Sequence, residues 1–137
     1  MTGDRAFVDS NVWVYLFTSE DSPKCKVAER FLAAAEGTLV ISYQVVNEVA
    51  NVLLKKGFDE HRVRFVMGSM SKICIVQDYS GDIVLLASTL REKHHFSFWD
   101  SLIVASAQAS QCRYLVSEDM QDNQVVGGVT IKNIFKV

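Results

Sequence analysis

The chain has 137 residues, of which 49% are hydrophobic and 22% charged, a composition typical of a globular protein with one domain over residues 1–137. Its formal net charge of −2 argues against a protein whose whole surface binds nucleic acid, although clustered acids that hold metal ions would also lower the charge of a nuclease. The longest apolar runs are too short to cross a bilayer, and the first residues lack the layout of a signal peptide, so we expect a cytoplasmic protein without a membrane span.

Short apolar runs predict five strands, and segments with helical spacing lie between them. The expected strands are 6–9, 38–42, 72–76, 113–117 and 129–135. The expected helices are 22–37, 42–57, 60–71, 82–93 and 98–110, the first beginning with Ser22 as N-cap before Pro23 and the second with a cap near Ser42. Because strands alternate with helices, the pattern predicts an α/β fold with a mostly parallel sheet covered on both faces.

Three cysteines, Cys25, Cys74 and Cys112, are widely spaced and odd in number. Neither a disulfide framework nor a zinc site fits this spacing, so we interpret them as small buried apolar residues.

Asp9 is the one carboxylate in the apolar run FVDSNVWVYLF, at the carboxyl end of the first expected strand. Since DSN is rich in capping residues, Asp9 could cap a helix that begins within VWVYLF. The alternative is that Asp9 binds a cation, because an unpaired buried carboxylate is costly.

Two more acids lie in helical segments. Glu48 is placed beside the apolar stripe of its helix, near Val45 and Val52, where a solvated border position is the simpler interpretation. Asp100 follows Ser97 with the spacing of a capping box, in the first turn of a helix. A capping acid in this position can also project into a cleft.

Asp119 lies two residues after the fourth expected strand, in the acidic loop SEDMQDN, whose Glu118 we expect to be solvated. Because the carboxyl ends of parallel strands meet at one edge of a sheet, Asp9 and Asp119 are expected at the same edge. Mg²⁺ and Mn²⁺ prefer carboxylate ligands, and two such ions about 4 Å apart promote phosphodiester cleavage. The acids of four separated segments therefore predict a divalent metal site.

Four motifs, FVDSNVWVY, VVNEV, FSFWDSLIVASA and LVSEDMQD, occur in the order and at the approximate spacing found in PIN-domain ribonucleases, and the chain most resembles the VapC-type toxins. The resemblance covers essentially the whole chain. It implies a three-layer fold with a five-stranded parallel sheet, in the order 3-2-1-4-5, flanked by helices. It also implies metal-dependent cleavage of RNA, a small antitoxin protein that blocks the cleft, and a homodimer.

The resemblance carries four catalytic acids over to this chain. Asp9, Asp100 and Asp119 would hold one or two Mg²⁺ or Mn²⁺ ions, and Glu48 would orient or deprotonate the attacking water. No covalent intermediate is required.

Three further positions are matched by polar residues. Asn11 and Ser117 correspond to residues that support the acids by hydrogen bonding. Asp122 is a candidate for the outer coordination sphere, because the family's last loop often carries a second acid at a variable offset.

Residues that would bind RNA are harder to identify from the sequence than the catalytic acids. Basic residues near helix ends are candidates for phosphate contacts, although solvated surface is the simpler interpretation: Lys55, Lys56, Arg62, Arg64, Arg91, Lys93, His94 and His95. Trp13 and Trp99 each neighbour a proposed acid, and we expect core packing of both in preference to base stacking.

Other functions predict different residues. A haloacid-dehalogenase-like phosphatase would need a second aspartate where this chain has Asn11, and a response-receiver domain would need paired acids after the first strand. A non-catalytic RNA- or protein-binding module would not need all four acids. A PIN nuclease that is not a toxin remains open on sequence grounds.

Overall fold

The computed structural model describes residues 3–136, and their strands form one six-stranded sheet. The strands are β1 (Ala6–Val8), β2 (Leu39–Ser42), β3 (Ile75–Gln77), β4 (Tyr114–Val116), β5 (Val125–Val126) and β6 (Val129–Lys132). They lie in the order β3-β2-β1-β4-β6-β5, and every neighbouring pair is parallel except β5 and β6. The five predicted strands therefore pair in the predicted order, and β5 adds an antiparallel strand at one edge.

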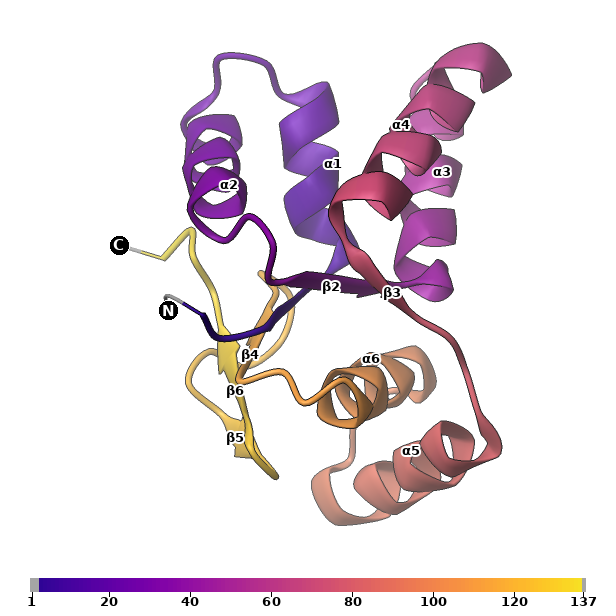
Figure 1. Ribbon diagram of the computed structural model, residues 1–137, viewed down its shortest axis with the longest axis vertical. Helices are drawn as coiled ribbons and strands as arrows, with labels where there is room; N and C mark the ends of the chain where they lie inside the picture. The colour runs from indigo at the N-terminus through magenta and orange to yellow at the C-terminus, as the bar shows by residue number, and fades with distance from the viewer. Residues whose placement is uncertain (1–2, 137) are drawn as a thin grey trace.

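Six helices cover the two faces of this sheet within the described residues. They are α1 (Ser10–Thr18), α2 (Pro23–Ala34), α3 (Tyr43–Lys55), α4 (Glu60–Ile73), α5 (Gly81–His94) and α6 (Phe98–Ala109). Helices α1 to α4 lie on one side of the sheet, and α5 and α6 pack together on the other side (Figure 1). This arrangement confirms the predicted three-layer PIN-like fold.

Three of the predicted helix starts are confirmed by their capping hydrogen bonds. The hydroxyls of Ser22 and Ser97 accept from the backbone N–H groups of Cys25 and Asp100, at 3.1 and 3.2 Å. Ser42 caps α3 in the same way. These caps satisfy N–H groups that the first helical turn leaves unpaired, so they fix where each helix leaves the sheet.

The end of α4, the start of β3 and the end of β6 were predicted wrongly. Helix α4 continues to Ile73, where Cys74 closes it by donating to the carbonyl of Met70, so β3 begins at Ile75 and not at residue 72. Strand β6 ends at Lys132 and not at residue 135, because the N–H of Asn133 donates to the side chain of Asp122. The backbone leaves the sheet at that hydrogen bond.

The core lies on both faces of the central strands. Phe7, Val40, Leu115 and Ile131 are completely or almost completely buried. Every residue of α6 from Ser101 to Ala107 is buried, because the helix packs against α5 as well as the sheet. Between residues 3 and 136, no helix has the length and apolar character that a membrane span requires.

Candidate functional site

Asp9 follows β1 and caps α1, and its carboxylate is only 6% exposed. One oxygen accepts from the N–H of Ser10 and the other from the hydroxyl of Ser117, each at 2.8 Å. Burial raises the pKa of Asp9, and the charges of Asp100 and Asp119 raise it further, while the two hydrogen bonds act in the opposite direction. The capping interpretation is thus confirmed, yet the cap leaves this carboxylate in an unfavourable electrostatic environment.

Asn11 and Ser117 connect Asp9 to the loop after β4. The Asn11 amide donates to the Ser117 hydroxyl at 3.3 Å and to a carboxylate oxygen of Asp119 at 3.2 Å. Its oxygen accepts from the N–H of Glu118, and the Ser117 hydroxyl accepts from the N–H of Asp119. The hydrogen bonding expected of these two residues is therefore present, and it sets Asp119 beside Asp9.

Glu48 reaches the same edge of the sheet from α3. Its Oε1 atom is buried and has no hydrogen-bond partner among the described residues. Burial, followed by the charges of Asp9 and Asp100, raises the pKa of Glu48 to about 7. Glu48 is therefore a poorly solvated carboxylate close to two other acids, not a solvated border residue.

Asp100 occupies the first turn of α6, and Asp119 is exposed in the loop after β4. Both act electrostatically on Asp9. Ion pairs within residues 3–136 join Lys24 to Glu118, Arg113 to Asp4 and Lys136 to Asp122, and none involves the four predicted acids. We call Asp9, Glu48, Asp100 and Asp119 the unpaired acids.

The donor chemistry of the unpaired acids fits a hard divalent cation. All of their donor atoms are carboxylate oxygens, and the orphaned Oε1 of Glu48 and the desolvated Asp9 would each gain a favourable partner. In the described part of the chain, however, no three Asp, Glu, His or Cys side chains stand close enough to one another to enclose a metal ion. The acids are thus close enough to influence one another's pKa values, but they do not form a closed coordination sphere.

Two pockets are lined in part by the unpaired acids. One, of about 560 Å³, is lined by Glu48 and aromatic and amide side chains of α3, the loop after β3, and α6. The other, of about 270 Å³, is lined by Asp100 and Asp119 together with His94 and His95. The acids therefore border both depressions.

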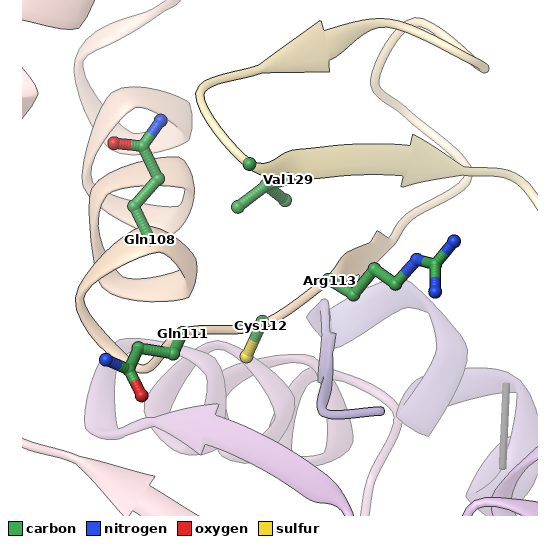
Figure 2. Close-up of a pocket in the computed structure, with 6 residues that line it drawn as sticks. Gln108, Gln111, Cys112, Arg113 and Val129 are labelled. Atoms are coloured by element: carbon green, nitrogen blue, oxygen red, sulfur yellow. The ribbon is translucent and has the colours of Figure 1, made fainter. Parts of the chain in front are cut away.

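A third pocket, of about 440 Å³, lies at the ends of the strands opposite to those that carry the unpaired acids. Figure 2 shows Gln108 near the end of α6, Gln111 and Arg113 between α6 and β4, and Val129 at the start of β6 around it. This pocket contains none of the unpaired acids and lies at the amino ends of the strands, whereas sites in open parallel sheets form at the carboxyl ends. We therefore place the functional site at the unpaired acids.

The structure corrects the expectations for Glu118 and Trp99, each of which directly precedes one of the unpaired acids in the sequence. Glu118 is not a solvated loop acid, because its carboxylate accepts from the Tyr15 hydroxyl and the Lys24 ammonium group. Trp99 is 58% exposed and is not part of the core, whereas Trp13 is buried as expected and donates to the carbonyl of Val8.

Asp122 and Arg91 make contacts that hold the fold together. Asp122 accepts from the backbone of Asn133 and lies 4.0 Å from Lys136. Arg91 donates to the buried hydroxyl of Ser101 at 2.8 Å, so its guanidinium group is already engaged. His94 and His95, by contrast, are exposed at the pocket that Asp100 and Asp119 line.

The sequence did not reveal the residues that line the pocket beside Glu48. Tyr43, Gln44 and Asn47 lie in the first half of α3, and Tyr79 lies in the loop after β3. No periodicity distinguishes such positions from ordinary surface.

The PIN domain family model matches residues 6–125 of the chain. A toxin–antitoxin complex from Klebsiella pneumoniae has a similar structure, with a TM-score of 0.72, 24% identity, and coverage of 91% of this chain and 95% of that one. VapC20 of Mycobacterium tuberculosis, described as a sarcin–ricin loop cleaving toxin, matches with a TM-score of 0.66 and 21% identity. The match covers 80% of this chain and 86% of that one. The DNA-bound VapBC complex of Salmonella typhimurium matches with a TM-score of 0.73 and 13% identity, covering 95% of this chain and 98% of that one. No curated protein sequence matches the chain significantly.

Proposed function

Because the chain belongs to the PIN domain family, we propose that it is a metal-dependent endoribonuclease and the toxin of a toxin–antitoxin pair. The observation that carries this proposal is the set of four carboxylates that the fold gathers from separated segments and leaves without a cationic side chain among residues 3–136. Acids in such a setting destabilise a protein unless a bound cation compensates them.

Asp9, Asp100 and Asp119 are the residues that would hold one or two Mg²⁺ or Mn²⁺ ions. When bound, a divalent ion polarises a phosphoryl oxygen and makes a nearby water more acidic. Glu48, which lies close enough to Asp9 and Asp100 to be affected by their charges, would orient or deprotonate that water. Ser117 and Asn11 keep Asp9 and Asp119 in position through the hydrogen bonds described above.

The direct test is RNA cleavage by an Asp100→Asn variant. Loss of one charged ligand removes several kcal/mol of transition-state stabilisation, so we expect cleavage to fall about a thousandfold or more. Asp82→Asn is the matched control, because Asp82 is also an acid in the first turn of a helix, α5, and it is exposed to solvent. Cleavage that survives Asp100→Asn at the rate of the control would contradict the proposal.

The toxin assignment adds a small antitoxin protein and a second copy of the chain as partners. Its support is the likeness to toxin–antitoxin complexes, and exposed apolar side chains along α3, α4 and β3 offer surface for partners: Leu54, Phe65, Ile73 and Ile75. Expression of the wild type is expected to arrest growth, and expression of Asp100→Asn is not. Growth that is equally unaffected by both chains, with RNA cleavage intact in vitro, would favour a PIN nuclease that is not a toxin.

A further inference from the structure

The pocket beside Glu48 is built from aromatic rings and side-chain amides. We call it the aromatic pocket and define it by its lining: Tyr43, Gln44, Asn47, Glu48, Tyr79 and Trp99. Its volume of about 560 Å³ falls within the range of small-molecule sites in proteins. The three aromatic side chains are all partly exposed, so their faces are open to a ligand.

Hydrogen bonds among these residues hold the pocket in shape. The Tyr79 hydroxyl donates to the side-chain oxygen of Gln44, and the Gln44 nitrogen donates to the backbone oxygen of Trp99 at 3.4 Å. Phe98 packs edge-on against Trp99, with ring centroids 4.9 Å apart. Gln44 thus ties the loop after β3 to the start of α6, and the indole of Trp99 is supported from one side.

The aromatic pocket is continuous with the unpaired acids. Glu48 belongs to both, and Asp100 directly follows Trp99 in the first turn of α6. Asp100 also lines the pocket of His94 and His95. An RNA strand bound in the aromatic pocket would therefore lie beside the unpaired acids.

The lining of the aromatic pocket determines what it can accept. No lysine, arginine or histidine lines it, and Glu48 adds negative charge, so a phosphate would not be held there. Flat rings together with amide and hydroxyl groups match a nucleobase, which has two stacking faces and hydrogen-bonding edges. Only an unpaired strand can present both the faces and the edge of a base to such a pocket.

We propose that the aromatic pocket binds a base of single-stranded RNA next to the cleaved phosphate, with Trp99 as the stacking surface. This inference rests on the proposed ribonuclease function. It assigns to Trp99 a role in substrate binding. The exposed amide of Asn47 is placed to contact the edge of the bound base.

Tryptophan fluorescence can test this role directly. The chain has two tryptophans, and since Trp13 is fully buried, a change in emission on adding RNA reports on Trp99. The titration uses a short single-stranded RNA and the Asp119→Asn variant, which prevents cleavage if the proposed function is right. We expect quenching by this RNA and none by an abasic strand of the same length.

A second series measures affinity for the same RNA. Base stacking is worth about 1–3 kcal/mol, so Trp99→Ala should weaken binding about 5- to 150-fold, while Trp99→Phe should retain most of it. Leu85→Ala is the control, because Leu85 is a 69% exposed apolar residue on α5 that does not line the pocket. Circular dichroism should show an unchanged fold in all three variants, since each residue is exposed.

Three results would overturn the inference. They are equal RNA affinity of Trp99→Ala and the wild type, unchanged emission at saturating RNA, and loss of antitoxin binding by Trp99→Ala with RNA affinity intact. The last would make the aromatic pocket a protein contact. Failure of the proposed function would be seen separately, as RNA cleavage that survives Asp100→Asn.

Discussion

Glu118 and Glu48 are acids of one fold in opposite environments. Although burial opposes it, hydrogen bonds from Lys24 and Tyr15 lower the pKa of Glu118, and its carboxylate joins the loop after β4 to α1 and α2. Burial and neighbouring acids raise the pKa of Glu48 to about 7, and one of its oxygens has no hydrogen-bond partner among residues 3–136. The fold therefore provides a cation for the acid that it uses structurally, and it leaves the acids that we assign to the catalytic site without one.

The same contrast separates the other acids of the carboxyl edge. Asp122 binds the backbone of Asn133 and lies near Lys136, so it belongs with Glu118 among the structurally engaged acids. Asp119, three residues earlier, accepts a hydrogen bond from Asn11 and is otherwise exposed to solvent. An outer-sphere role for Asp122 remains a prediction, and its contacts account for its presence without one.

The largest effect within this comparison is expected from Ser117→Ala. The Ser117 hydroxyl holds Asp9 and receives the N–H of Asp119, so its loss should displace two unpaired acids at once. Removing such an orienting group from a metal site costs about 10- to 100-fold in activity or metal affinity. RNA cleavage rates and Mn²⁺ affinity of the purified variant measure this loss.

Ser106→Ala is the matched control for that experiment. Ser106 is also a buried serine, but within the described chain its hydroxyl has no hydrogen-bond partner. Deleting an unsatisfied buried hydroxyl is neutral or stabilising, and it does not touch the unpaired acids. Equal losses of activity in the two variants would mean that Ser117 acts through packing alone.

A smaller effect is expected on thermal stability without metal. Its dependence on pH should have opposite signs in the Glu48→Gln and Glu118→Gln variants. Glu48 ionises near pH 4.5 when unfolded and at about pH 7 when folded, so its burial penalty is absent below pH 4.5 and complete above pH 7. Glu48→Gln should therefore match the wild type at low pH. Above pH 7 it should melt about 4 °C higher, about 1 kcal/mol after allowance for solvent exposure.

Glu118→Gln should show the reverse dependence. The folded-state pKa of Glu118 lies below its unfolded value of 4.5, so its ion pair stabilises the protein above pH 4.5, and this contribution is lost as the pH falls through the folded pKa. The variant should melt at a lower temperature than the wild type at neutral pH, and this difference in melting temperature should disappear at low pH. Thermal melts in a chelator across this range measure both variants, and curves of the same sign would remove the contrast between the two glutamates.

Much of the fold could be predicted because local signals agreed with the packing. Ser22 followed by Pro23, and the caps at Ser42 and Ser97, set helix starts by local hydrogen bonds that the sequence states directly. The dense apolar runs identified the central strands, since strands buried on both faces need no alternation. The acids were found through the motifs that carry the family resemblance, and their role at the site stays a prediction.

Features that depend on contacts between distant segments were missed. Strand β5 forms because Gly127, with φ of +60°, turns the chain back, and the Gly-Gly pair between apolar residues was an available hairpin signal. Trp99 was misplaced because a tryptophan beside an apolar helix is more often core than surface. Nothing local shows that Lys24 of α2 reaches Glu118 after β4, so that ion pair was out of reach.

Calorimetric titration with Mn²⁺ tests the central claim most directly, because it asks whether the unpaired acids bind a cation at all. We expect saturable binding by the wild type, Asp82→Asn and Glu118→Gln, and binding weakened by about tenfold or more in Asp9→Asn and Asp100→Asn. Absence of saturable binding by the wild type, or equal binding by all five proteins, would contradict the account.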